Sequence, residues 1–353
     1  MAVEPTPTLP ASTNLSKDPR SRPLLVRPGA AFDCFGDGLC CTDIHALGPV
    51  TRKEKQEVEL LEPGSLVRHK DLMAPVFRTQ ESGACVLRSQ RGCELHARHG
   101  AQAKPVGCAR FPFGLVATPE GGRVTTEHRC PCRSMGERPA ITPENALPSL
   151  LDAAGRLSPN GRVGPRIPLG AGRYVGFARF LEIERMLFPL LTSTDVDPVR
   201  ALDAKPFGKL DGERWSEISK LMRQEQDGTA YGEAMVWMAN AIDARDGGSS
   251  LELGARPWSA AFDRAEARSK KRGSEEVLRD WLADLLWSMD WVFSMGSFHA
   301  GRRELATVYT LAKSITERLV RARVRTDRAA AEAITVVELA RQSEAWERVQ
   351  KAL

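Results

Sequence analysis

The second half of the chain has the hydrophobic periodicity of packed α-helices. Apolar residues recur there at spacings of three and four, which places their side chains on one face of a helix. The clearest stripe follows Ser274 and ends at Gly296; its members are Leu278, Trp281, Leu282, Leu285, Leu286, Met289 and Val292. Further helices are predicted at 175–188, from Trp215 onward, and at 231–244, 302–323 and 327–353. We therefore predict an all-α domain over residues 173–353.

Residues 31–138 show little regular periodicity. The pattern predicts only a helix over Glu54 to Leu61 and a short strand over Arg123 to Glu127, with turns and loops elsewhere. Irregular backbone is expected where a bound metal, rather than a large core, holds a module together. The fold class predicted for the chain is thus α-rich, with an irregular module followed by a helical domain.

Two other segments have no strong helix or strand pattern. Residues 1–30 are rich in Pro, Ser and Thr near their start and are predicted to be a disordered leader. Residues 139–172 alternate prolines and glycines and are predicted to be a linker, with one short helix beginning at Thr142-Pro143-Glu144. Helix ends are predicted at Pro189 and at Gly247-Gly248.

Composition limits the classes of function. The chain has 353 residues, 42% hydrophobic and 27% charged, as expected of a globular protein. Its formal charge of +5 is too small to indicate a nucleic-acid binder. No signal-peptide pattern and no apolar run of about 18 residues is present, so we expect a cytoplasmic protein without a membrane partner.

The cysteines and tryptophans are segregated along the chain. All eight cysteines lie between Cys34 and Cys132, and all seven tryptophans lie between Trp215 and Trp346. This distribution favours two domains of different chemistry, the second of which would bind a protein partner or protein substrate. In a reducing cytoplasm a group of eight cysteines indicates metal binding or redox chemistry rather than stable disulfides.

The cysteines form four short groups: Cys34 with Cys40-Cys41, then Cys85 with Cys93, then Cys108, then Cys130-Pro131-Cys132. None of these groups is a standard pair of zinc-finger knuckles, so spacing alone does not name the metal. Eight thiols could fill two sites of four, or one site with spare redox thiols.

The four groups together resemble the CxxCxxCC-type cysteine-cluster family, also called the YkgJ family, which is described as zinc- or iron-chelating. The matching pieces are Cys34, Asp37, Cys40 and Cys41; Cys85-Val86-Leu87; Cys93-Glu94-Leu95-His96; Lys104-Pro105-Val106-Gly107-Cys108-Ala109-Arg110-Phe111-Pro112; and Cys130-Pro131. The resemblance covers about residues 32–136 and does not extend to the helical half. It implies a metal-chelating domain at 31–138.

Three positions depart from the family pattern. Asp37 stands where the family has its second cysteine, Lys104 replaces an arginine, and Ala109-Arg110 moves another arginine by one place. Asp37 is either an oxygen ligand, which favours zinc or iron over copper(I), or a lost ligand. The candidate ligands are therefore Cys34, Asp37, Cys40, Cys41, Cys85, Cys93, Cys108, Cys130 and Cys132. For His96, His99 and His128 we expect surface or supporting roles rather than ligation.

The metal expected from these residues is iron, as an iron–sulfur cluster or as iron alone, with zinc as the alternative. Two other functions remain open. The same pieces are similar, more distantly, to flagellin lysine-N-methylase, which implies methyl transfer from S-adenosylmethionine to protein lysine. A zinc-stabilised interaction module without catalysis is the other. The sequence defines no catalytic residues, since no serine–histidine–aspartate set or carboxylate pair can be argued from spacing.

Overall fold

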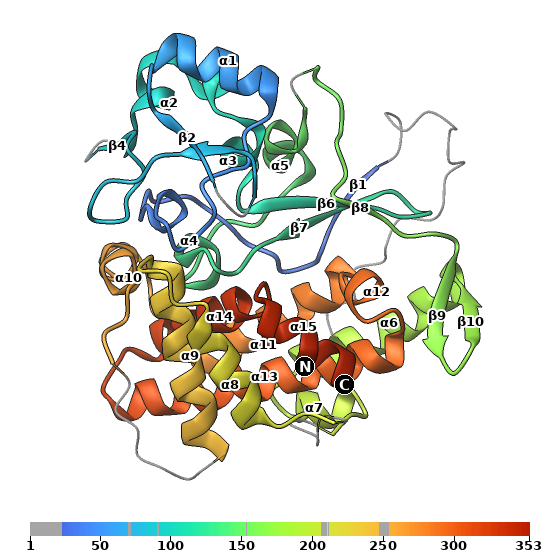
Figure 1. The fold of residues 1–353 in the computed structure, drawn as a ribbon. Coiled ribbons are helices and arrows are strands. Elements are labelled where there is room, and N and C mark those ends of the chain that lie inside the picture. Colours follow the sequence, from blue (N-terminus) through green and yellow to red (C-terminus); the bar gives the residue numbers. More distant parts are fainter. Residues whose placement is uncertain are drawn as a thin grey trace.

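The structure, a computed structural model, describes residues 23–353 apart from 70–71, 90–91, 153, 206–209, 211 and 247–253. It is α-rich, with fifteen α-helices within these described residues. Figure 1 shows strands and short helices of the first part of the chain lying above the longer helices of the second part. Within the described residues, each helix is too short or too polar to cross a lipid bilayer.

The second half forms a helical layer around one central helix. Its elements are α6 (Phe177–Thr192), α7 (Pro198–Ala201), α8 (Trp215–Gln224), α9 (Ala230–Asp246), α10 (Ser259–Glu266), α11 (Ser274–Ser288), α12 (Trp291–Ser294), α13 (Phe298–Arg321), α14 (Thr326–Ala340) and α15 (Glu344–Ala352). Helix α14 is buried from Asp327 to Ala340 and contacts α9, α11 and α13. Its alanines allow close approach of these neighbours, because helix separation follows side-chain size.

Most of the predicted helices are present. Helix α8 begins at Trp215 as predicted, and α9 and α13 cover most of the segments predicted at 231–244 and 302–323. The predicted end of α9 at Gly247-Gly248 lies outside the described residues. Helices α7 and α10 were not predicted, since each is short and α10 shows only one clear turn of apolar spacing.

Three predicted helix boundaries are wrong. Pro189 lies inside α6, and the helix continues to Thr192 because the Ser193 N–H donates to the Pro189 carbonyl. The stripe from Ser274 to Gly296 is divided between α11 and α12, because Met289 adopts a left-handed φ of 54° and ends α11. The segment 327–353 likewise forms two helices, and Ser343 caps the second one.

The first part of the chain is built on a four-stranded sheet. The strands are β1 (Leu24–Val26), β6 (Phe113–Ala117), β7 (Gly122–Thr126) and β8 (Gly161–Arg162), in the order β1-β7-β6-β8. Strands β6 and β7 form an antiparallel hairpin, with Phe113 opposite Thr126, and β1 and β8 pair in parallel with its two sides. Strand β7 is the one predicted at 123–127, shifted by one residue.

The remaining elements of the first part are short. They are α1 (Arg52–Leu61), α2 (Glu94–His99), α3 (Val106–Arg110), α4 (Pro131–Ser134), α5 (Pro143–Leu150), η2 (Leu39–Cys41), η3 (Ala101–Ala103), and the hairpins β2 (Leu66–Arg68) with β3 (Pro75–Phe77) and β4 (Arg88–Ser89) with β5 (Gly92–Cys93). Helix α1 is the predicted helix, and Thr51 and Glu54 close a reciprocal capping box at its start.

Three of the predicted segments contain structure that the pattern did not indicate. Strand β1 lies in the segment assigned to the disordered leader, and its pairing with β7 explains its order. The predicted linker contains the expected helix α5 and also β8, which completes the sheet. The predicted all-α segment begins with β10 (Arg173–Gly176), which forms a hairpin with β9 (Arg166–Gly170). All these strands have five residues or fewer, too short for a reliable alternation.

The two parts of the chain share one hydrophobic core. Leu39, Ile44, Val116 and Met135 from the first part belong to the same buried cluster as the helices of the second part. Helix α11 packs on β7, and α4 contacts α10 and α14. The boundary between the parts is therefore a packed interface.

Candidate metal centre

The opening cysteine motif is a tight loop that turns around Asp37. Gly36 and Gly38 on either side of it have φ values of 68° and 77°, which glycine adopts at low cost. A Cβ on Gly38 would lie 2.5 Å from the guanidinium of Arg88, so a side chain at this position would displace that guanidinium. Asp37 is only 4% exposed, and its Oδ1 accepts a hydrogen bond of 2.9 Å from the Leu39 N–H.

The closing motif places two thiols at the start of α4. Cys130 is the N-cap residue of this helix, Pro131 is its first residue, and Cys132 follows. Proline is favoured at this place because the N–H it lacks has no partner in the first turn. Both cysteines are buried, Cys132 completely.

These two motifs meet in one group of ligand atoms, which we call the interface cluster and which consists of Cys34, Asp37, Cys130 and Cys132. Single ligand atoms of Asp37, Cys130 and Cys132 all lie within 4.8 Å of one another, and no other trio of His, Cys, Asp or Glu within the described residues does so. The Cys132 thiol donates to Asp37 Oδ2 over 2.7 Å. We include Cys34 in the cluster because its interaction with the neighbouring Cys132 thiol is the largest cause that raises the pKa of Cys34.

Hydrogen-bond donors and arginine side chains surround the interface cluster, and both would stabilise negative charge on its ligands. The Phe35 N–H donates to the Cys132 sulfur over 3.1 Å. Four arginine side chains donate to main-chain carbonyl oxygens of the same segments. Arg88 and Arg264 donate to the Asp37 carbonyl over 3.3 and 2.7 Å. Arg268 donates to the Phe35 carbonyl over 2.7 Å, and Arg138 donates to the Cys132 carbonyl over 3.0 Å. Cations and amide donors near sulfur both stabilise a thiolate.

The thiols of the interface cluster are nevertheless held in their protonated form. Hydrogen bonding to Cys130 is the first cause of the raised pKa of Cys132. The pKa of Cys130 is also raised overall. The interaction with Cys132 lowers it, but burial and the charge of Asp37 outweigh that effect. The crowding of negative groups thus disfavours thiolates without a cation, and a metal ion placed among them would release their protons.

A second set of thiols, which we call the outer cysteines, consists of Cys41, Cys85, Cys93 and Cys108. They share one hydrophobic cluster whose described members all come from residues 41–108. The Cys85 N–H donates to the Cys41 carbonyl over 2.8 Å, and Cys93 lies in the β4–β5 hairpin opposite Arg88. No three of these four sulfurs lie within 4.8 Å of one another, unlike the ligand atoms of Asp37, Cys130 and Cys132. Burial is the main cause that raises the pKa of Cys85 to about 11 and that of Cys108 to about 12.

Cys40 and Cys41 connect the two sets. Their sulfurs lie 3.9 Å apart. The hydrogen bond from Cys40 is the largest cause that lowers the pKa of Cys41 to about 7, and the charges of Lys104 and Arg88 act in the same direction. The same bond raises the pKa of Cys40, as do burial and the charges of Cys41, Asp37 and Cys34. Eight of the nine candidate ligands from the sequence therefore belong to one of the two sets, and the ninth, Cys40, contacts Cys41 of the outer cysteines.

The histidines occupy other positions. His96 is exposed on α2, and His99 lies 3.3 Å from Glu62. His128 is buried, with its Nε2 2.7 Å from Asp284 Oδ2. His45 is buried against Phe111, and its Nδ1 contacts Arg129 over 3.1 Å. None of them contributes to the interface cluster.

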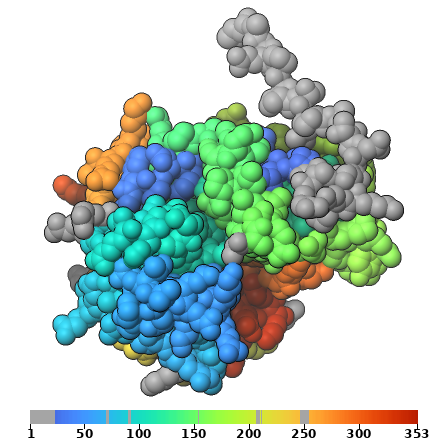
Figure 2. Space-filling view, turned by 90° about the horizontal axis from the view of Figure 1, so that it is seen from above, coloured from blue at the N-terminus to red at the C-terminus, as the bar shows by residue number. Residues whose placement is uncertain are grey.

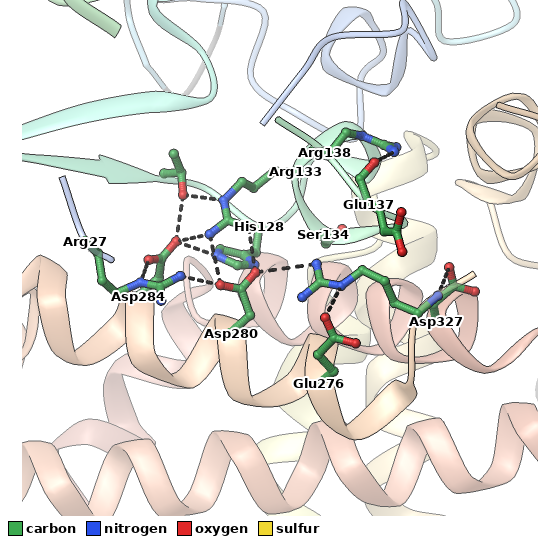
Figure 3. A network of polar contacts seen from close by, with 12 residues as sticks. Arg27, His128, Arg133, Ser134, Glu137, Arg138, Glu276, Asp280, Asp284 and Asp327 are labelled. Atoms are coloured by element: carbon green, nitrogen blue, oxygen red, sulfur yellow. Dashed lines mark hydrogen bonds and ion pairs between the residues drawn. The ribbon is translucent and has the colours of Figure 1, made fainter. Parts of the chain in front are cut away.

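Next to the cluster lies a buried ionic network that sequence reasoning missed. We call it the interface network; it consists of Arg27, His128, Arg133, Asp280 and Asp284. Figure 3 shows Arg27 and Arg133 converging on the two aspartates of α11. Arg133 lies 2.7 Å from Asp280 and 2.6 Å from Asp284, and Arg27 forms ion pairs with both. The only sequence signal was the i, i+4 spacing of two aspartates among the apolar residues of α11.

Comparisons with protein-family models, with curated proteins and with solved structures each gave no match.

Proposed function

We propose that this protein binds a metal ion through the interface cluster, with Cys34, Asp37, Cys130 and Cys132 as ligands. The observation that carries the proposal is the buried group of Asp37, Cys130 and Cys132, whose ligand atoms lie within 4.8 Å of one another. Three thiols and one carboxylate form a complete tetrahedral donor set for zinc or iron.

The spacing of the donors fits such an ion. Metal–sulfur bonds of about 2.3 Å in a tetrahedral site place neighbouring donors about 3.7 Å apart. The ligand atoms of Asp37, Cys130 and Cys132 already lie within 4.8 Å of one another, and the proposal requires the Cys34 sulfur to move toward them when the ion binds. A bound ion would hold thiolates that already have an N–H donor at Phe35 and arginines on the adjoining carbonyls.

A purely structural role for the same residues is less consistent with Asp37. A buried carboxylate is normally paired with a cation, because burying an isolated charge is costly. The carboxylate contacts of Asp37 are the Leu39 amide and the Cys132 thiol, while the neighbouring arginines contact its main-chain oxygen. A metal ion supplies the missing positive charge.

The outer cysteines are proposed as a second metal centre. Four thiols match the ligand set of an iron–sulfur cluster or of a structural zinc ion. Iron is the metal we propose for the protein, as an iron–sulfur centre or as iron alone, with zinc as the alternative. The resemblance to the CxxCxxCC-type family supports metal chelation by these residues, and we propose the helical half as the part that binds a protein partner or substrate in the cytoplasm.

Metal analysis of anaerobically purified protein tests the proposal. The full chain should contain iron or zinc in stoichiometric amount, and an iron–sulfur centre would add visible absorption. Cys132→Ser should lose the interface ion. Thr118→Ala is the matched control and should keep it, because it removes a buried hydroxyl that donates to the Gly121 carbonyl in the β6–β7 turn, away from the proposed ligands. Equal metal content in the two variants, or no metal in the parent protein, would contradict the proposal.

A further inference from the structure

Both backbone segments of the interface cluster are attached to helices of the second half of the chain. On the loop from Cys34 to Asp37, the attachment is made by α10 and the residues after it. Arg264 donates to the Asp37 carbonyl and Arg268 to the Phe35 carbonyl, each over 2.7 Å. In Figure 2 the orange segment that follows α10 lies beside the dark blue N-terminal segment.

The other segment, α4, is attached through α11. Helix α4 has four residues, too few to be stable alone. The fully buried Arg133 connects it to Asp280 and Asp284, as Figure 3 shows. Arg138, just beyond α4, links the Cys132 carbonyl to the Ser269 hydroxyl over 3.0 and 2.9 Å. The two cysteines of α4 are thus fixed by contacts to the helical half.

The outer cysteines have a different environment. Their hydrophobic cluster is formed within residues 41–108, and the neighbouring side chains, such as Val58 and Leu95, come from the first part of the chain. The two sets of thiols therefore differ in which part of the protein supports them.

We infer that Arg264, Asp280 and Asp284 are positioning residues of the interface cluster, and that they determine how tightly this cluster retains a metal ion. The inference rests on the proposed metal-binding function. Ordering two loops that come from distant parts of the chain costs conformational entropy, and contacts that fix them beforehand lower this cost. Residues that orient metal ligands without touching the metal commonly change metal affinity by about 10- to 100-fold.

The test uses the full chain with Cys85→Ser, which disables the outer set, loaded with Zn²⁺ as the probe. Release of Zn²⁺ to a chromophoric chelator is measured at matched folded fractions, checked by circular dichroism. Arg264→Gln should accelerate release about tenfold, because the Asp37 loop loses one attachment. Arg264→Lys should accelerate release less than Arg264→Gln does, because a lysine can still donate to the Asp37 carbonyl.

Asp280→Asn should act more strongly, but it leaves Arg27 and Arg133 with less compensation and could prevent folding. Arg264 is exposed and contacts a main-chain oxygen, so its replacement leaves no buried charge and keeps the inference testable. In the Cys132→Ser background, where only the outer cysteines can bind Zn²⁺, Arg264→Gln should leave release unchanged.

Glu184→Gln is the matched control for loosening of the interface. Glu184 of α6 pairs with Arg123 of β7 at 2.7 Å, and both are buried, but neither lies on a segment that carries a ligand of the interface cluster. It should lower stability without changing Zn²⁺ release. Faster release in Glu184→Gln, or unchanged release in Arg264→Gln, would overturn the inference. Failure of the Cys85→Ser parent to bind Zn²⁺ would instead overturn the proposed function.

Discussion

The Cys132 thiol lies 2.7 Å from the carboxylate of Asp37, although 95 residues separate them in the chain. The contact forms because the glycine-flanked loop around Asp37 and the short helix α4 are brought to the same place by α10 and α11. In the motif that resembles the CxxCxxCC pattern, Asp37 stands at the place of the second cysteine. Its carboxylate contacts the Cys132 thiol. This geometry favours Asp37 as a ligand over the alternative of a lost ligand.

Substitutions of Asp37 test its role as a ligand. Asp37→Ala removes a donor and a negative charge, so Zn²⁺ affinity should fall by at least about tenfold. Asp37→Cys supplies a thiolate in its place and should retain or tighten binding. Chelator competition on the full chain measures both. Equal affinity of Asp37→Ala and the parent protein would show that Asp37 is not a ligand.

The two glycines beside Asp37 provide a matched pair of variants. Each has a left-handed φ, so an alanine at either place should cost about 1–2 kcal/mol of folding free energy. Only at Gly38 would the new Cβ also collide with Arg88, whereas the space at Gly36 is open. Gly38→Ala should therefore weaken Zn²⁺ binding more than Gly36→Ala does. Calorimetric titration compares them, and the reverse order would argue against Arg88 as a support of the loop.

Cys41 should be the most reactive thiol of the metal-free protein at neutral pH. Its pKa of about 7 leaves roughly half of it as thiolate at pH 7, while the thiols of Cys85 and Cys108 remain protonated. Brief alkylation followed by mass spectrometry should find Cys41 modified first, with a rate that rises through pH 7. Added Zn²⁺ should suppress the reaction if Cys41 is a ligand. Faster labelling of Cys85 would contradict the assignment.

The interface network should make the protein sensitive to acid. Burial alone would raise the pKa of Asp280 and of Asp284, but the charges of Arg27 and Arg133 outweigh it and hold both pKa values well below the ordinary range. A depressed pKa stabilises the fold above the ordinary carboxyl value of about 3.9. This stabilisation is lost as the pH falls from there towards the pKa of the folded state.

Asp284→Asn provides the comparison. At pH 7 it should destabilise the protein by about 3–5 kcal/mol, because it leaves a buried arginine with one partner fewer. Below about pH 4 the parent protein should lose up to about 1.4 kcal/mol more per pH unit than the variant does. Urea unfolding at a series of pH values measures this. Parallel pH profiles would show that Asp284 does not carry the acid sensitivity.

The sequence was sufficient for the features that depend on local patterns. The helix predicted over Glu54 to Leu61 is present as part of α1, and the apolar stripe of α11 marks a buried helix. The cysteine motifs, together with Asp37, identified the candidate ligands. These signals are contained in segments of a few turns, where spacing determines which face a side chain occupies.

Features that depend on distant contacts were beyond such reasoning. Arg27 forms an ion pair with Asp284 across 257 positions, and nothing near Arg27 in the sequence indicates it. The division of the thiols between the interface cluster and the outer cysteines depends in the same way on where α4 docks. The segregation of cysteines from tryptophans did not indicate the hydrophobic core that the two parts share.

X-ray absorption at the zinc edge tests the central claim most directly. The sample is the full chain with Cys85→Ser, loaded with one equivalent of Zn²⁺. A metal centre formed by Cys34, Asp37, Cys130 and Cys132 predicts three sulfur neighbours at about 2.3 Å and one oxygen neighbour at about 2.0–2.2 Å. Asp37→Cys in the same chain should replace that oxygen neighbour by a fourth sulfur. An unchanged spectrum in Asp37→Cys, or a zinc environment without sulfur, would contradict the claim.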